Sequence, residues 1–259
     1  MMNIKVLVDN TAAQGFEAVH GFSALIEADE RILFDVGPTS LFLENAAKMN
    51  LNLDELKTIV LSHGHWDHGD GLQFISGKRL ITHPNSFCLR YRKEAKSIVG
   101  LKLSREEMAA KFSLEEYKSP YWISDKMVFL GEIPRKNDFE SQSTTFLLAD
   151  GSPDFVTDDS GIAIKTNKGL VVISGCAHAG ICNTVAYAKE MCGEEKVYAV
   201  LGGFHLKKID EVFQKTVAYF QKVKLELLGA THCTSFAVQD EFKKYFNTIN
   251  LEAGVEIEL

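Results

Sequence analysis

The composition of the chain is that of an ordinary globular protein. It has 259 residues, 46% of them hydrophobic and 24% charged, which excludes a low-complexity or fibrous chain. The net charge of −7 argues against nucleic acid or an anionic membrane surface as a partner. The length suits one substantial core, and we expect a single domain over residues 1–259.

The cysteines and the first residues indicate a compartment. An odd, scattered set is a poor disulfide framework, and the set here is Cys88, Cys176, Cys182, Cys192 and Cys233. Met1 to Asp9 has no charged-then-apolar signal pattern, and no apolar run approaches the roughly 20 residues needed to cross a bilayer. We therefore expect a cytoplasmic protein whose free thiols are available as metal ligands.

The first third of the chain favours strands. β-rich or alternating runs predict strands at 4–8, 24–27, 31–34, 58–61 and 80–82. Helical spacing of apolar residues predicts a helix over 41–49, with Asn50 as its cap. The short run at 58–61 is apolar throughout, as expected for a strand with both faces covered, and it leads directly into a cluster of histidines.

The middle and last parts of the chain differ in composition and in expected secondary structure. Residues 85–121 are rich in Lys, Arg and Glu, with helix formers around 105–112, and predict a helical or irregular insertion over the core. Further strands are expected at 146–149, 161–166, 170–173, 197–201 and 226–229, and helices at 184–191 and 209–223. Strands precede helices in both halves, which predicts an α/β fold of two sheets packed face to face with helices outside, an αββα sandwich.

The segment richest in chemistry is His63-Gly64-His65-Trp66-Asp67-His68. Three histidines and an aspartate fall within six residues, directly after a strand. A tight loop can turn such side chains toward one point, and imidazole nitrogens and carboxylate oxygens are ligands that zinc and iron accept. A surface histidine cluster without ligands is the alternative interpretation.

This pattern resembles the His-x-His-x-Asp-His signature of the metallo-β-lactamase superfamily, matched at His63, His65, Asp67 and His68. The resemblance implies that the first two histidines bind one metal and the Asp-His pair a second. Further stretches are similar to a subgroup labelled dihydropteroate-synthase-like, or synthase of a ribofuranosylaminobenzene phosphate pterin precursor. They are 8–10, 33–37, 131–135, 174–180, 202–206 and 231–233. The label is a weak guide to the substrate, because one fold hosts many chemistries.

The resemblance also implies roles for residues outside the cluster. Asp35 matches an aspartate that supports the histidine loop from behind and is not itself a ligand. His178 is expected as the third ligand of the first metal and His232 as a ligand of the second. The chain departs from the usual pattern by carrying Gly175-Cys176 in place of Gly-Asp, so Cys176 or Asp159 is an alternative member of the metal shell.

Other residues are candidates for the same pocket. His205 follows two glycines and a strand, and is a candidate catalytic residue that donates to a substrate anion; a structural histidine is the alternative. His83 and Arg135 are weaker candidates. His20 has no supporting context in the sequence and is assigned to the surface.

Together these residues predict a binuclear metal enzyme with two divalent cations, zinc first and iron or manganese as alternatives. Two cations sharing a water would produce a bridging hydroxide near neutral pH, with Asp67 orienting it, for hydrolysis of an ester, lactone or phosphoester. The alternatives are a metal-dependent synthase or transferase of pterin (methanopterin-like) biosynthesis, a di-iron redox protein, and a metal sensor without turnover. We expect a small-molecule substrate, with a phosphorylated compound as one possibility. A homo-oligomer is a further possibility that the sequence does not decide.

Overall fold

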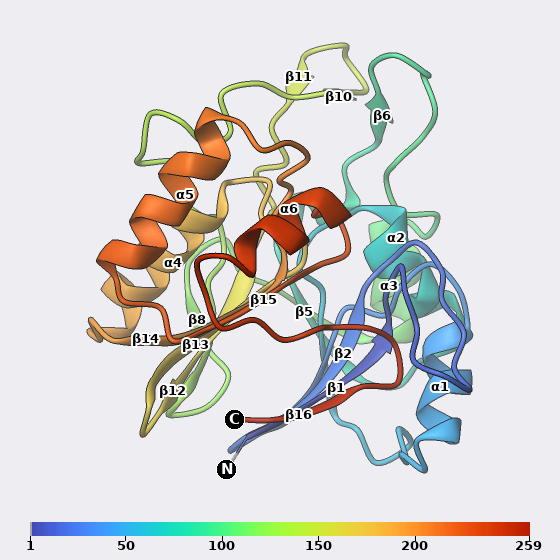
Figure 1. Ribbon diagram of the computed structural model, residues 1–259. Helices are drawn as coiled ribbons and strands as arrows, with labels where there is room; N and C mark the ends of the chain where they lie inside the picture. The colour runs from blue at the N-terminus through green and yellow to red at the C-terminus, as the bar shows by residue number, and fades with distance from the viewer. Residues whose placement is uncertain (1) are drawn as a thin grey trace. The chain divides into compact units, whose positions relative to one another are not determined.

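The computed structural model describes residues 2–259. This stretch of chain divides into two compact units. Unit 1 comprises residues 2–118, 145–154 and 252–259, and unit 2 comprises 119–144 and 155–251. Figure 1 labels the helices and strands of both. The expectation of a single domain stays a prediction.

Unit 1 is built on a seven-stranded sheet in the order β16-β1-β2-β3-β4-β5-β7. The strands are β1 (Asn3–Val8), β2 (Ser23–Glu27), β3 (Arg31–Phe34), β4 (Thr58–Val60), β5 (Arg79–Thr82), β7 (Ser113–Glu116) and β16 (Glu256–Glu258). Pairing is antiparallel from β16 to β3 and parallel from β3 to β7. The parallel strands β3 to β5 therefore end at one edge of the sheet, where Asp35 and the histidine cluster follow.

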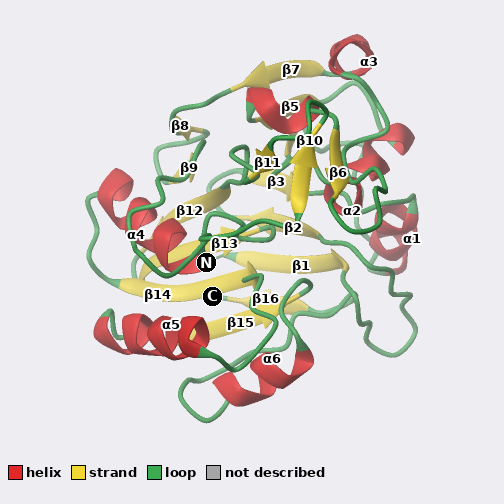
Figure 2. Cartoon of the chain, turned by 90° about the horizontal axis from the view of Figure 1, so that it is seen from above, coloured by secondary structure: helices red, strands yellow, loops and turns green. Residues whose placement is uncertain are grey.

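Smaller elements complete unit 1. A second sheet of three strands, ordered β11-β10-β6, pairs residues far apart in sequence, and Figure 2 shows β10 and β6 side by side. Its strands are β6 (Arg90–Arg92), β10 (Phe146–Leu148) and β11 (Pro153–Asp154). The helices are α1 (Leu41–Lys48), α2 (Trp66–Gly69) and α3 (Arg105–Lys111), with 3-10 turns η1 (Asp70–Phe74) and η2 (Pro84–Phe87). The predicted insertion over 85–121 thus holds one α-helix, α3, and most of the 3-10 turn η2, and the rest is strand and loop.

Unit 2 carries a six-stranded sheet in the order β15-β14-β13-β12-β9-β8. The strands are β8 (Tyr121–Trp122), β9 (Met127–Phe129), β12 (Gly161–Thr166), β13 (Gly169–Ser174), β14 (Val197–Gly203) and β15 (Leu227–Thr231). From β13 to β15 the strands are parallel, and β13 is buried along its whole length. Three neighbouring strands therefore present their carboxyl ends at one edge.

The helices of unit 2 are α4 (Ile181–Cys192), α5 (Glu211–Lys222) and α6 (Phe236–Phe242). Figure 1 shows α4 and α5 side by side against the sheet of this unit. Their apolar faces share one core with the strands, in which Phe204, Phe213, Phe220 and Phe242 contact one another. This core fixes the strands and helices from whose ends the candidate site residues project.

Candidate metal centre

The histidine cluster of unit 1 lies on the loop that follows β4 and on the short helix α2. His63 and His65 are on the loop, and Asp67 and His68 are in α2. All four side chains are buried. Gly64 allows the tight path between the first two histidines, because a Cβ there would lie 1.7 Å from the carbonyl oxygen of Ser86. A residue with a side chain could not stand at position 64 without moving the backbone, which explains the glycine between the two histidines.

The three histidines of this loop converge. The Nε2 atom of His63 lies 3.0 Å from Nδ1 of His65, and the ring centroids of His63 and His68 are 4.3 Å apart. Two nitrogens bound to one tetrahedral zinc at 2.0–2.1 Å would be separated by about 3.3 Å. The distance between the His63 and His65 nitrogens therefore fits a pair of ligands to a single cation.

The protonation state of His63 suits ligation. Burial lowers its pKa well below the ordinary value, and the neighbouring His68 and His65 lower it further. A neutral imidazole is the form that donates a lone pair to a metal. The loop therefore presents His63 in the form that binds a cation.

Asp35 supports this loop from behind. Its Oδ1 accepts the backbone N–H of Ser62 at 2.7 Å, and its Oδ2 accepts the Ser62 hydroxyl at 2.7 Å and lies 2.7 Å from Nδ1 of His68. Asp35 itself has a φ of 56°, a conformation that costs energy in a residue other than glycine and persists only where surrounding contacts hold it. The predicted contact of Asp35 with the histidine loop is confirmed.

Asp67 has a partner that the sequence did not suggest. The Nε2 atom of His20 lies 3.1 Å from Oδ2 of Asp67, and the His20 side chain is 54% exposed. Close by, the N–H of Phe22 donates to the carbonyl oxygen of Asp67 at 3.2 Å. His20 is exposed, as the sequence analysis expected, but the loop between β1 and β2 folds back onto α2 and gives it a contact that was not predicted. No local pattern could have revealed a contact between residues so far apart in sequence.

In unit 2, His178 lies in the turn between β13 and α4, and Asp159 holds that turn. The Asp159 Oδ2 atom accepts the N–H of Ala179 at 2.9 Å. Burial raises the pKa of Asp159 to about 7, against the opposing effect of the N–H groups of Ala179 and His178. Ala177, next to His178, has a φ of 53°. Asp159 thus supports His178 from the backbone side, much as Asp35 supports His68.

His205 and His232 follow β14 and β15 in the same unit. Both are in the left-handed region, with φ of 53° and 49°. Three hydrogen bonds join their loops: His205 N–H to Cys233 Sγ at 3.2 Å, Phe204 N–H to Thr234 Oγ1 at 3.0 Å, and Ser235 N–H to Leu206 O at 2.9 Å. The rings of His178 and His205 have centroids 4.4 Å apart. Unit 2 therefore gathers His178, His205 and His232 at the carboxyl ends of its parallel strands.

The thiol of Cys233 at this edge is strongly perturbed. Burial would raise its pKa, but hydrogen bonding with Cys176 and His205 and the nearby charge of His205 and His232 lower the pKa well below its usual value. A thiolate is the form of cysteine that binds metals. The sequence pattern pointed to Cys176 in this role and gave no reason to choose Cys233.

Comparisons with known proteins agree with this geometry. A family model described as the metallo-beta-lactamase superfamily matches residues 17–79. A crystal structure described as a metal-dependent hydrolase of the beta-lactamase superfamily superposes with a TM-score of 0.90 at 30% identity, covering 100% of this chain and 99% of the other. The chain belongs to the metallo-β-lactamase superfamily. The predicted α/β fold of metallo-β-lactamase type is thereby confirmed.

Two relatives within the superfamily come from Methanocaldococcus jannaschii. An uncharacterized protein is 35% identical over 262 residues, covering 97% of this chain and 98% of the relative. A second is named 7,8-dihydropterin-6-methyl-4-(β-D-ribofuranosyl)-aminobenzene-5'-phosphate synthase. It is 33% identical over 255 residues, covering 89% of this chain and 86% of the relative. The expected subgroup resemblance is confirmed.

Two weaker candidates have structural partners. The His83 Nδ1 atom accepts the N–H of Asn85 at 3.1 Å and so caps η2. The Arg135 guanidinium donates to Ser141 Oγ at 3.0 Å and to the carbonyl oxygen of Phe155 at 2.6 Å. Both side chains therefore stabilise loops, and their candidacy for the pocket stays a prediction.

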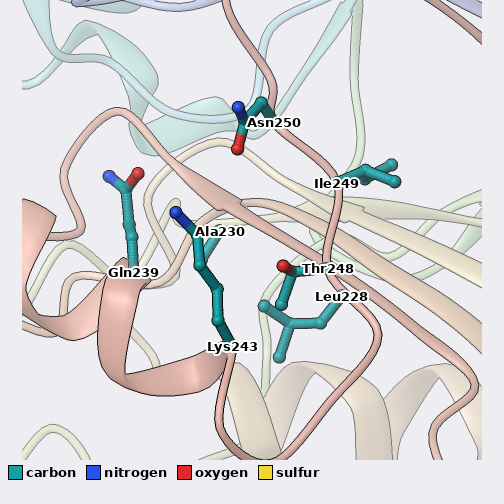
Figure 3. Close-up of a pocket in the computed structure, with 7 residues that line it drawn as sticks. All are labelled: Leu228, Ala230, Gln239, Lys243, Thr248, Ile249 and Asn250. Atoms are coloured by element: carbon teal, nitrogen blue, oxygen red, sulfur yellow. The ribbon is translucent and has the colours of Figure 1, made fainter.

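A small pocket of unit 2 lies away from these groups. Figure 3 shows Lys243, Gln239 and Asn250 at its margin, and its volume of about 20 Å³ is roughly that of one water. None of the candidate metal ligands lines it. In residues 2–259, no helix is long and apolar enough to cross a membrane.

Proposed function

We propose that the chain is a metal-dependent hydrolase that holds two divalent cations and acts on an ester, lactone or phosphoester. The observation that carries this proposal is the convergence of the His63 and His65 nitrogens at 3.0 Å, with His68 held by Asp35. Buried imidazoles in this arrangement suit zinc, and also accept iron or manganese.

The ligands we propose follow the superfamily pattern. His63, His65 and His178 hold the first cation, and Asp67, His68 and His232 hold the second. Asp159 is left out, because its Oδ2 accepts the N–H of Ala179 and the residue serves the turn that carries His178.

Bound divalent cations supply Lewis acidity, which lowers the pKa of water toward neutrality and polarises a carbonyl or phosphoryl oxygen. Asp67 orients the attacking water, and its contact with His20 limits the directions its carboxylate takes. His205 donates to an anionic oxygen of the substrate. Support comes from its place at the carboxyl end of β14, where its ring lies 4.4 Å from that of His178. These roles suit a small substrate, including a phosphorylated one.

The direct test is metal reconstitution followed by a substrate screen. Chelator-treated protein, reloaded with zinc, manganese or iron, is assayed for metal content and for hydrolysis of carboxylic esters, lactones, phosphomonoesters and phosphodiesters. We expect two cations per chain that depend on the histidine loop, and metal-dependent turnover of at least one class. The control is a His63→Ala, His65→Ala double variant, which should lose these loop-dependent cations and the turnover. Fewer than one bound cation after reloading would refute the proposal.

A second candidate is the pterin-forming reaction named for the 33% identical relative. That name describes a product in which a dihydropterin methyl group is joined to a ribofuranosyl-aminobenzene 5'-phosphate. The same cations would stabilise the anionic charge of such substrates. Incubation with an activated dihydropterin and ribofuranosyl-aminobenzene 5'-phosphate, followed by mass spectrometry, separates the two functions. The coupled product without ester or lactone hydrolysis would favour the synthase.

A further inference from the structure

Three neighbouring parallel strands of unit 2 end near a cysteine, a histidine and a cysteine. The last paired residues are Ser174 with Gly202 between β13 and β14, and Gly203 with Thr231 between β14 and β15. Each strand then delivers a metal-binding side chain two residues beyond its end. These side chains are Cys176, His205 and Cys233. Their ligand atoms all lie within 4.8 Å of one another.

The cluster is packed closely. Cys176 is 3% exposed and Cys233 is 4% exposed. The Cys233 Sγ atom accepts the N–H of His205 at 3.2 Å and lies 3.4 Å from the carbonyl oxygen of Cys176. Gly203 makes this approach possible, because a Cβ there would lie 2.7 Å from Cys233 Sγ and 3.2 Å from Cys176 Cα. The backbone therefore brings the two thiols and the imidazole together.

We propose that Cys176, His205 and Cys233, all in unit 2, form a further cation site for a thiophilic transition metal, with Zn²⁺ first. Two thiolates and an imidazole are a ligand set that zinc accepts, with a fourth position left for water or substrate. Ligand atoms around one tetrahedral zinc are about 3.3–3.8 Å apart. Side-chain movements of about 1 Å would therefore bring the three ligand atoms to zinc-binding distances.

A second observation points to a ligand here. The Nδ1 atom of His205 is buried and makes no hydrogen bond in the part of the chain that the structure describes, residues 2–259. A buried nitrogen without a partner is costly, and binding to a cation removes that cost. His205 also has a left-handed backbone, with φ of 53°, which costs conformational energy. Its N–H contact with Cys233 Sγ stabilises this conformation.

This site goes beyond the proposed function, because it needs no ligand from the histidine loop of unit 1. The chain also offers matched control cysteines. Cys182 and Cys192 are buried in the apolar core of unit 2, and burial raises the pKa of both thiols. They should stay protonated and bind no metal.

The test uses the full chain with the histidine loop disabled by His63→Ala, His65→Ala and His68→Ala. It is loaded with Co²⁺ or Zn²⁺ under reducing, oxygen-free conditions. We expect about one equivalent of metal, a near-ultraviolet thiolate-to-cobalt band, and two sulfur neighbours of zinc by X-ray absorption. Adding Cys233→Ser should lower affinity by at least about tenfold, since loss of an outer partner alone costs 10–100-fold. The control variant Cys182→Ser should leave the metal affinity and the thiolate band unchanged.

The outcomes separate this site from the proposed binuclear one. Three equivalents in the parent chain and one in the loop-disabled chain support both sites. One equivalent with the same spectrum in both chains supports this site and refutes the binuclear centre. A loop-disabled chain with no thiolate band, fewer than two sulfur neighbours, or a band of unchanged intensity in Cys233→Ser refutes this site. Sulfur counting requires no variant at Cys233, so a misfolded Cys233→Ser leaves the test decisive.

Discussion

Asp35 fixes which nitrogen of His68 is available to a cation. The Oδ2 atom of Asp35 lies 2.7 Å from Nδ1 of His68, so Nδ1–H donates to the carboxylate and Nε2 is the atom for ligation. A carboxylate behind a ligating imidazole sets the tautomer and ring orientation and raises the basicity of the other nitrogen. The same carboxylate also holds Ser62, and thereby the start of the histidine loop.

Replacing Asp35 should therefore weaken metal binding while the fold persists. We expect Asp35→Asn to reduce metal affinity roughly 10–100-fold, as for other partners of ligating histidines. Competition with a chelator of known affinity measures the change, and circular dichroism checks the fold. Asp54→Asn, at an exposed aspartate, is the control. Unchanged metal affinity in Asp35→Asn would show that Asp35 serves only the turn and does not support metal binding.

His178 should be required for one of two cations in the binuclear centre. His178→Ala is expected to lower the metal content by about one equivalent, because a three-ligand site loses a direct ligand. Elemental analysis after dialysis against buffer gives the count. The Lys189→Ala variant in the neighbouring helix α4 should keep the full content. Full metal occupancy in His178→Ala would remove it from the ligand set.

The structure explains which features were predictable. The strands β1 to β5 and β12 to β15 were predicted because their apolar runs carry a local signal, and the histidine cluster because its ligands are adjacent in sequence. The strands β6, β8, β9 and β11 have two or three residues each and form through pairing with distant segments, so no local signal exists. His20 and Cys233 escaped notice for the same reason, since their partners Asp67 and His205 are brought close only by the fold.

The buried carboxyl of Asp159 predicts a pH-dependent stability in metal-free protein. Its pKa is raised from 3.8 to about 7, first by burial. A raised folded-state pKa means that the stabilising contribution is complete below pH 3.8 and is lost as the pH rises to about 7. Relative to Asp159→Asn, the free energy of unfolding should therefore fall across this window, by up to roughly 4 kcal/mol.

Urea denaturation at several pH values between about 4 and 7.5, in the presence of chelator, measures this difference. Asp125→Asn, at an exposed aspartate, should give a difference that stays flat with pH. A flat profile for Asp159→Asn as well would show that Asp159 ionises normally in the folded protein.

His20 is expected to affect turnover more than stability. It is 54% exposed, so His20→Gln should change the free energy of unfolding by less than about 0.5 kcal/mol. Loss of its contact with Asp67 should lower kcat by roughly tenfold while metal content is kept, as expected for imperfect positioning of a catalytic group. Steady-state kinetics on any substrate found in the screen, with Glu17→Gln as control, tests this. A change confined to KM would place His20 in substrate binding.

The path of the chain at Gly64 gives the sharpest structural prediction. A Cβ at Gly64 would lie 1.7 Å from the carbonyl oxygen of Ser86, and a backbone atom cannot move aside as a flexible side chain does. Gly64→Ala should therefore destabilise the protein by about 3 kcal/mol or more and displace His63 and His65 from each other. Gly77→Ala is the control: nothing lies within 4 Å of its added Cβ, so only its positive φ of 71° opposes alanine, at about 1 kcal/mol. Thermal denaturation and chelator competition on both variants give the two readouts. Equal stability and equal metal affinity in the two variants would mean that the loop between the histidines tolerates a side chain, and that Gly64 does not set their spacing.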